Sequence, residues 1–171
     1  MEGPSLVILS EELQLFKNKT VLDVSGNSKK DIERIKGRKI EDIKSWGKHL
    51  LIQLDGFSVK IHFLMFGSYR INEQKENRFP RLSLVFEEGE INFYSCSVQL
   101  LEKNLSDIYD WTADVMSNEW DEKAAIKKVK SVKDRLICDV LMDQDVFAGV
   151  GNIIKNEVLF NVYLHPEALV A

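Results

Sequence analysis

The sequence lacks the residues that would place it in several common classes of protein. Its two cysteines, Cys96 and Cys138, are too few for a disulfide framework, and neither has the Cys or His spacing that indicates a zinc site. No run approaches the roughly 20 apolar residues of a membrane-spanning helix, and the N-terminus lacks a basic segment followed by an apolar one. These absences predict a cytoplasmic protein with reduced thiols, no signal peptide and no membrane contact.

An excess of positive charge is also absent. The 23 Lys and Arg residues are outnumbered by 27 Asp and Glu residues, which gives a net charge of −4 and a pI near 5.5. This argues against a protein that is basic all over, although affinity for nucleic acid depends on local patches that neutralise phosphates. A lysine-rich run follows an acidic stretch and forms either a solvated helix face or a DNA-facing patch. Its lysines are Lys123, Lys127, Lys128, Lys130 and Lys133.

The sequence contains two successive hydrophobic patterns, first a helical one and then a series of short β-type runs. Residues 4–17 have a proline in the first turn and apolar residues at helical spacing. Short β-type runs separated by turns such as Asp55-Gly56 and Glu88-Gly89 follow, which is typical of a sandwich or barrel. We therefore predict an α+β fold, with an N-terminal helix plus antiparallel β-sandwich over residues 1–104 and an all-helical region over 105–171. The expected strands are 21–24, 39–43, 49–54, 58–63, 68–71, 82–86 and 91–94, and the later helices are 122–129, 135–142 and 152–164.

The most informative stretch runs from Leu141 to Phe160. It ends an apolar helix at Asp143, makes a turn that contains Gly149 and Gly151, and starts a second helix at Asn152. Free backbone N–H groups at a helix N-terminus suit an anion such as a DNA phosphate. The alternative is an ordinary helix start that Asn152 caps. The second helix carries an apolar stripe of Ile153, Ile154, Val158, Leu159 and Phe160.

This stretch closely resembles the helix–two-turn–helix of the formamidopyrimidine-DNA glycosylase and endonuclease VIII family. That family usually reads Leu-Leu-Asp-Gln, then Gly-Val-Gly-Asn-Ile-Tyr, then Asn-Glu-x-Leu-Phe. The resemblance implies that Gly151, Asn152 and Lys155 hold DNA phosphates around a lesion. It covers nearly all of the chain, which is shorter at its C-terminal end than a typical member. Because zinc belongs to a C-terminal finger that this sequence does not contain, the resemblance implies no cofactor or metal here.

The N-terminus, Met1-Glu-Gly-Pro-Ser, resembles the Pro-Glu-Gly-Pro-Glu of endonuclease VIII-like members after removal of methionine. Met1 stands where the family has a proline whose α-amine attacks C1′ of the damaged nucleoside, and any free α-amine can form an imine. Glu2, which is too large to permit normal removal of Met1, matches the acid that shuttles protons. The other interpretation of Met1 is an inert initiator residue. Ser5 replaces a second family glutamate whose role differs among members.

Two further motifs resemble the family. Trp46-Gly-Lys-His-Leu-Leu51 places Lys48 where a lysine lies beside the catalytic amine, although a lysine at a strand start is otherwise a solvated edge residue. In His62-Phe-Leu-Met-Phe-Gly67, the histidine would contact a phosphate near the lesion. The next three residues would fill the space of the everted nucleotide. Their order is closer to endonuclease VIII, because the loop 96–100 lacks the Arg and Phe of formamidopyrimidine glycosylases. These wedge residues, which otherwise belong to a strand buried on both faces, are Leu64, Met65 and Phe66.

The resemblance implies a base-excision repair DNA glycosylase with AP lyase activity that removes oxidised bases through a Schiff base on its N-terminal amine. Its partner would be damaged DNA, which a monomer would bind, and the cytoplasmic protein would be nucleoid-associated when bound. Two alternatives stay open. One is a module that recognises damaged DNA without cleaving it, because Met1 has lost the chemistry. The other is a fragment that folds but binds DNA weakly.

Overall fold

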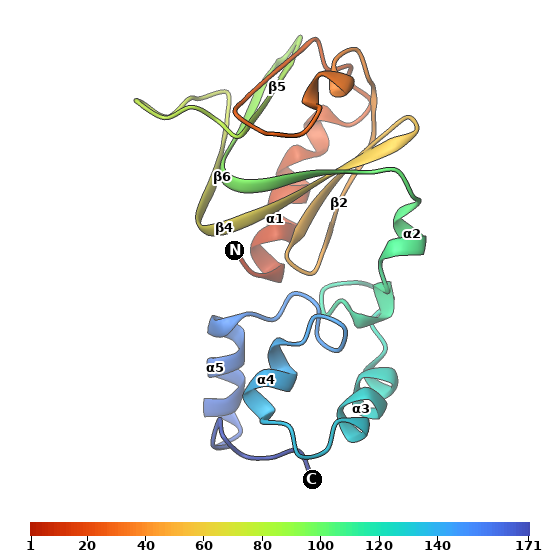
Figure 1. Cartoon of the computed structure of the whole chain (residues 1–171), viewed down its shortest axis with the longest axis vertical. Helices are drawn as coiled ribbons and strands as arrows, with labels where there is room; N and C mark the ends of the chain where they lie inside the picture. Colours follow the sequence, from red (N-terminus) through yellow and green to blue (C-terminus); the bar gives the residue numbers. More distant parts are fainter.

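One antiparallel sheet and a set of short helices form two parts that are stacked along the long axis of the molecule (Figure 1). The structure is a computed structural model that describes residues 1–171. The N-terminal part holds α1 (Gly3–Glu12), η1 (Leu13–Phe16), β1 (Asp23–Ser25), η2 (Ile32–Ile35), β2 (Ile40–Trp46), β3 (His49–Leu54), β4 (Phe57–Ile71), β5 (Leu82–Phe86) and β6 (Gly89–Leu101). The helical part holds α2 (Leu105–Ile108), η3 (Trp111–Ala113), α3 (Glu122–Ser131), α4 (Ile137–Met142) and α5 (Asn152–Asn161).

The sheet has the strand order β1-β5-β6-β4-β3-β2, and every neighbouring pair is antiparallel. The two longest strands, β4 and β6, run through both halves of it. Their pairing is interrupted between Phe63 and Ser68, opposite Ser95, whose φ of 49° is positive. The two expected strands 58–63 and 68–71 are therefore one strand with an irregularity between them. The hairpin turn expected at Asp55-Gly56 is present, and the turn expected at Glu88-Gly89 lies one residue earlier, at Glu87-Glu88, because Phe86 pairs with Gly89.

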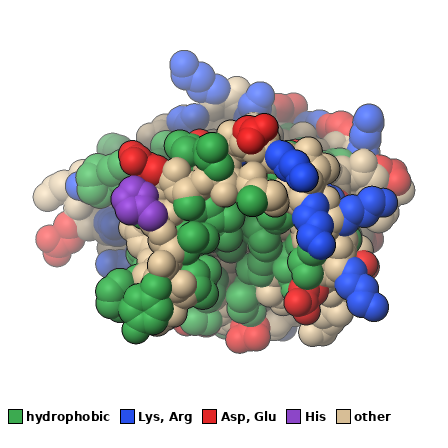
Figure 2. Space-filling view, turned by 90° about the horizontal axis from the view of Figure 1, so that it is seen from below, with side chains coloured by type: hydrophobic (Ala, Val, Ile, Leu, Met, Phe, Trp, Pro, Cys, Tyr) green, Lys and Arg blue, Asp and Glu red, His purple; other side chains and the backbone are tan.

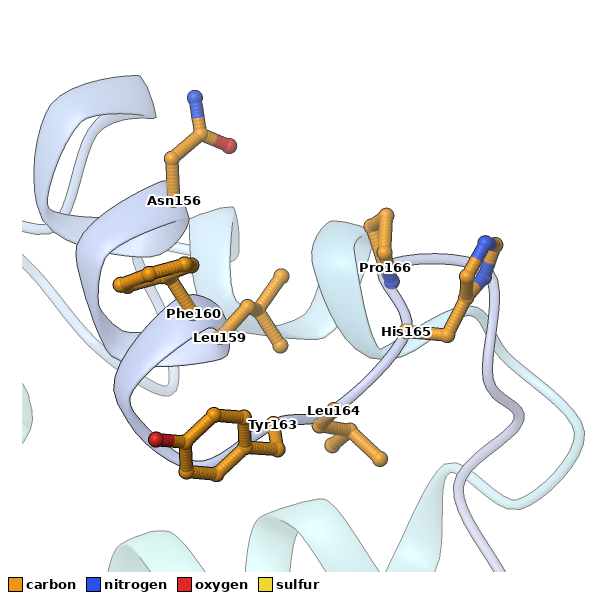
Figure 3. A pocket seen from close by; sticks show the side chains of 7 residues that line it. All are labelled: Asn156, Leu159, Phe160, Tyr163, Leu164, His165 and Pro166. Atoms are coloured by element: carbon orange, nitrogen blue, oxygen red, sulfur yellow. The ribbon is translucent and has the colours of Figure 1, made fainter.

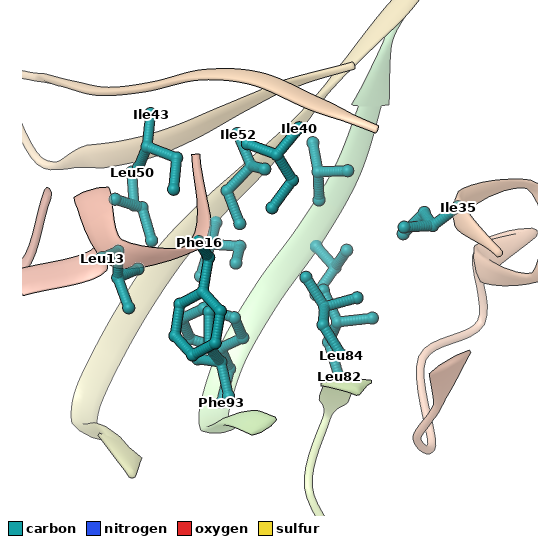
Figure 4. Close-up of a cluster of buried hydrophobic side chains, with 14 of the residues drawn as sticks. Leu13, Phe16, Ile35, Ile40, Ile43, Leu50, Ile52, Leu82, Leu84 and Phe93 are labelled. Atoms are coloured by element: carbon teal, nitrogen blue, oxygen red, sulfur yellow. The ribbon is translucent and has the colours of Figure 1, made fainter. Parts of the chain in front are cut away.

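The main core lies between the two halves of the sheet. Leu13 and Phe16, at the end of the N-terminal helix, lie between Ile43, Leu50 and Ile52 on one side and side chains of β5 and β6 on the other (Figure 4). The Phe16 ring stacks on Phe86 with a centroid distance of 4.4 Å. Each fully buried side chain of this size contributes roughly 1.5–3 kcal/mol. The predicted α+β class, with the N-terminal helix and the sandwich-like packing, is confirmed.

The helical part differs from expectation in what it buries. Only Leu159 of the predicted apolar stripe of α5 is buried, while Ile153 and Phe160 are 72% and 73% exposed. The helix ends at Asn161, earlier than expected, because Tyr163 adopts a positive φ of 53°. Figure 2 shows the molecule from the end at which the helical part lies. Hydrophobic side chains gather in the middle of this face, with lysines and arginines along one side.

The C-terminal end of α5 borders a shallow apolar depression of about 470 Å³ (Figure 3). The residues around it are Asn156, Leu159, Phe160, Tyr163, Leu164, His165 and Pro166. None of the helices has the length and the apolar character needed to cross a membrane.

A second, smaller core connects the two parts. Trp46 and Leu51 of the sheet pack against Leu105, Tyr109 and Ala148 of the helical part. The Trp46 indole Nε1–H also donates a hydrogen bond of 3.0 Å to the carbonyl of Asp110. These contacts fix the helical part against the β2–β3 end of the sheet. The division into domains at residue 104 stays a prediction.

Candidate functional site

Three segments that are far apart in the sequence meet at the turn around Gly149. The backbone N–H of Gly3 donates to the Gly149 carbonyl at 2.8 Å. Gly47 lies so close to the same turn that a Cβ on it would be 3.2 Å from the Cβ of Ala148. The N-terminal residues, the Lys48 turn and the start of α5 are therefore neighbours, as the sequence motifs predict.

Glu2 caps α5. Its Oε1 accepts the backbone N–H of Ile153 at 2.8 Å, and its Oε2 accepts that of Ile154 at 3.1 Å. A carboxylate at a helix N-terminus is stabilised by these donors and by the helix dipole. Gly151 permits the approach, because a Cβ there would lie 2.4 Å from Glu2 Oε1. The expectation that these amides are free for a phosphate is therefore wrong for Ile153 and Ile154.

The start of α5 keeps other donors. The backbone N–H groups of Gly151 and Asn152 have no hydrogen-bond partner within the chain. The N-cap residue is Gly151, so the alternative that Asn152 is a plain N-cap is wrong. The Asn152 side chain is exposed, and its Oδ1 accepts from Lys155 Nζ at 3.1 Å. This contact leaves the amide –NH₂ of Asn152 available to an outside acceptor.

Lys48 is the second residue of the two-residue turn between β2 and β3, which joins the pair Trp46 and His49. The φ of Gly47 is +54°, which a type II′ hairpin turn requires at its first position. Lys48 is half-buried, and its Nζ makes no hydrogen bond or ion pair within the chain. Its carbonyl accepts a hydrogen bond of 3.1 Å from His62 Nδ1. The role of Lys48, at the site or as a solvated strand-edge residue, stays a prediction.

The bond to the Lys48 carbonyl fixes the proton on His62. A carbonyl only accepts, so Nδ1 of His62 carries a hydrogen, and Nε2 donates only when the ring is protonated on both nitrogens. His49 pairs with His62 across the strands, with ring centroids 5.3 Å apart. Burial, with the charges of Lys60 and His62, lowers the pKa of His49 to about 4, so His49 stays neutral.

The three predicted wedge residues project into solvent at the interruption of the β4–β6 pairing. Leu64, Met65 and Phe66 are 52%, 89% and 78% exposed. They lie within β4 rather than in a separate loop, and the strand bends tightly here, since a Cβ on Gly67 would lie 2.7 Å from the Cβ of Phe63. The alternative that they are core residues is wrong.

Met1 lies beside an open depression of about 460 Å³ that sequence reasoning missed. The Met1 amine makes no hydrogen bond or ion pair within the chain. Tyr69, also at the depression, donates to Glu12 Oε2 at 2.7 Å. Burial and this carboxylate raise the pKa of Tyr69 to about 12, so the phenol stays neutral. The other residues around the depression are Ser68, Arg70 and Ile71.

The lysine run lies apart from this site. Lys128 is held by Asp110 Oδ2 at 2.9 Å and by the Asp145 carbonyl at 2.7 Å, so it connects elements of the helical part. The other lysines of the run are exposed and form no ion pair. Helix α3 lies on the side of the helical part opposite α5 (Figure 1), which favours a solvated face. No three His, Cys, Asp or Glu side chains are grouped as a metal site would require.

Comparisons with known proteins agree with this geometry. The formamidopyrimidine-DNA glycosylase N-terminal domain matches residues 5–97, and the formamidopyrimidine-DNA glycosylase H2TH domain matches residues 111–171. Endonuclease 8-like 3 of Mus musculus is 32% identical over 98% of this chain and 29% of its own length. Formamidopyrimidine-DNA glycosylase of Shouchella clausii is 29% identical over 91% of this chain and 63% of its own length.

Solved structures show the same fold. The crystal structure of a viral DNA glycosylase has a TM-score of 0.88 and 21% identity, and covers 99% of this chain and 73% of its own. Lactococcus lactis formamidopyrimidine-DNA glycosylase, crystallised with DNA that contains an AP site, has a TM-score of 0.84 and 22% identity over the same shares. The chain spans only 22–29% of the Endonuclease 8-like 3 relatives. With both domain models matched and the three motifs together at one site, the chain belongs to the formamidopyrimidine-DNA glycosylase and endonuclease VIII family.

Proposed function

We propose that the protein is a base-excision repair DNA glycosylase with AP lyase activity that removes oxidised bases from damaged DNA. The observation that carries the proposal is the meeting of three segments at the Gly149 turn. The N-terminal segment joins it through Gly3, the Lys48 turn through Gly47, and the start of α5 is held by Glu2. The wedge residues are exposed elsewhere on β4. Relatives crystallised with AP-site or 8-oxo-G-containing DNA support DNA as the ligand. We further propose that the protein acts as a monomer without a cofactor in this chain. Its cytoplasmic, nucleoid-associated location stays a prediction.

The proposed reaction begins at the α-amine of Met1. α-Amines are less basic than lysine amines, so a larger fraction is neutral and nucleophilic at pH 7. The amine attacks C1′, a nitrogen–carbon bond forms, the glycosidic bond breaks, and the base leaves with a proton. The C1′–O4′ bond of the sugar then breaks, the remaining N–H proton passes to O4′, and a C1′=N imine is left. In the lyase step, a base removes a C2′ proton, the C3′–O bond breaks, and water hydrolyses the imine.

The side chains around Met1 have distinct roles in this proposal. Glu2, adjacent in the chain, exchanges protons with the sugar oxygen, and Lys48 stabilises a neighbouring phosphate and assists elimination. Gly151, Asn152, Lys155 and His62 supply further donors to the DNA backbone. The wedge residues Leu64, Met65 and Phe66 fill the stack that the everted nucleotide leaves. Unstacking costs a few kcal/mol per step, which apolar wedge residues help to offset.

Borohydride trapping tests the proposal. The protein is incubated with a duplex that contains one abasic site, and sodium borohydride reduces any imine to a stable amine. We expect a covalent protein–DNA adduct, and loss of the adduct when the N-terminal amine is acetylated beforehand. DNA binding without an adduct from the unmodified protein would reject the enzyme and favour the non-cleaving module. Neither binding nor adduct would favour the weakly binding fragment.

A further inference from the structure

Asp114 is the single charged residue among the buried residues of the chain. It follows η3 and is 3% exposed. No Lys, Arg or His forms an ion pair with it. Burial raises the pKa of its carboxyl group, since the charged form loses hydration. An unpaired buried carboxylate is costly unless hydrogen bonds replace the lost water.

Both of its oxygens accept backbone hydrogen bonds. Oδ1 accepts the N–H of Met116, and Oδ2 accepts the N–H of Gly47, each at 3.0 Å. The bond to Met116 is local, but the bond to Gly47 reaches across from the helical part to the β2–β3 turn. Gly47 directly precedes Lys48. The far side of the same turn is held by the bond from His62 to the Lys48 carbonyl.

Asp114 is also fixed relative to the N-terminal residues. On either side of it, the Ala148 N–H donates to the Ala113 carbonyl at 2.8 Å, and the Val115 N–H donates to the Ala148 carbonyl at 3.1 Å. This short ladder places Asp114 beside Gly149, whose carbonyl accepts from Gly3. The carboxylate therefore lies between the Lys48 turn and Gly149, the residue that binds the backbone of Gly3.

We propose that Asp114 is a positioning residue for Lys48. Its carboxylate holds the Gly47 N–H and so sets the direction from which the Lys48 side chain reaches the site of the Met1 amine. The inference rests on the proposed function. An asparagine has similar size but only one acceptor oxygen, so its –NH₂ group would face one of the two N–H donors. Misplacement by about 1 Å of a group that acts in the reaction can cost about 10²-fold in rate.

The test is a double-mutant cycle between Asp114→Asn and Lys48→Ala, with single-turnover β-elimination on a preformed abasic site. We expect Asp114→Asn to slow elimination by about 10- to 100-fold with little change in Kd for DNA. In the Lys48→Ala protein, Asp114→Asn should change the rate by less than about 2-fold, because the group it positions is gone. Equal losses in both backgrounds, or no loss in either, would overturn the inference.

Asp110→Asn is the matched control. Asp110 has an exposed carboxylate in the same segment, which bonds to Thr112 and Lys128. Its contact with Trp46 beside the Lys48 turn is made by the backbone carbonyl, which asparagine retains. We expect this variant to retain the elimination rate. If the Asp114→Asn protein does not fold, hydrogen exchange of the Gly47 amide is measured in the unsubstituted protein. Exchange as fast as that of an unprotected amide would show that the Gly47–Asp114 hydrogen bond is absent and would overturn the inference. Absence of any imine with a well-protected Gly47 amide would reject the proposed function instead.

Discussion

Replacing Gly151 with alanine should break the contact between Glu2 and α5. A Cβ at residue 151 would lie 2.4 Å from both the Oε1 and the carboxylate carbon of Glu2, so the glutamate must move away. The φ of Gly151 is −122°, which alanine adopts without strain. The substitution therefore acts through the clash, plus the modest preference of an N-cap position for glycine over alanine.

The size of the effect follows from what Glu2 does. Losing an N-terminal cap costs about 0.5–2 kcal/mol, and removing a negative charge from the helix N-terminus about 0.3–1 kcal/mol more. Since Glu2 is half-buried, we take about 2 kcal/mol for the two hydrogen bonds together. For a chain of this length, that loss lowers Tm by about 4–8 °C.

Thermal unfolding of Gly151→Ala, Glu2→Ala and the double variant measures this loss. Most of the effect of Gly151→Ala should vanish in the Glu2→Ala background, which leaves a coupling of about 1 kcal/mol or more. Ile153→Ala, at an exposed position of the same helix, should change Tm little. Independent, additive effects of the two substitutions would refute the capping role of Glu2.

Three further predictions concern catalysis and binding. Glu2→Gln should slow base removal by about 10²–10⁴-fold while DNA binding is largely retained, and full glycosylase activity in this variant would reject the assigned role. Replacing Met65 and Phe66 together with alanine should leave Tm nearly unchanged, because both are exposed, yet weaken base removal from duplex more than elimination at a preformed abasic site; equal losses would argue against a wedge. His62→Leu should weaken DNA binding while Tm changes little, because leucine cannot donate to a phosphate and the ring makes only one hydrogen bond within the chain. Unchanged DNA affinity in His62→Leu would show that His62 does not contact the DNA backbone.

The sequence predicts those parts of the site that depend on local order. The exposed wedge was predicted from the resemblance of residues 62–67 to the endonuclease VIII order, because three apolar residues in a row also fit a strand buried on both faces. The structure adds the break in the β4–β6 pairing at this point. The helix start at Asn152 follows from the glycine turn before it. Both signals lie within a few residues of the feature that they predict.

The parts that the sequence does not predict depend on long-range contacts. The bonds from α5 to Glu2 and from Gly47 to Asp114 join residues that have no local relationship. Residues 96–100 were interpreted as a loop from the family resemblance, and this is wrong, because they lie in β6. This half of the strand forms because residues 96–101 pair with residues 58–63 of β4. One signal for the contact with Glu2 was present in the sequence. Gly151 has no side chain, and a glycine often marks a position where another group approaches the backbone closely.

The most direct test of the account is to locate the covalent bond in the trapped complex. The borohydride-reduced adduct with abasic DNA is digested and its modified peptide is identified by mass spectrometry. The account predicts that the reduced sugar is attached to the α-nitrogen of Met1. Attachment to Lys48 Nζ or another lysine would contradict the central claim that the N-terminal amine is the nucleophile.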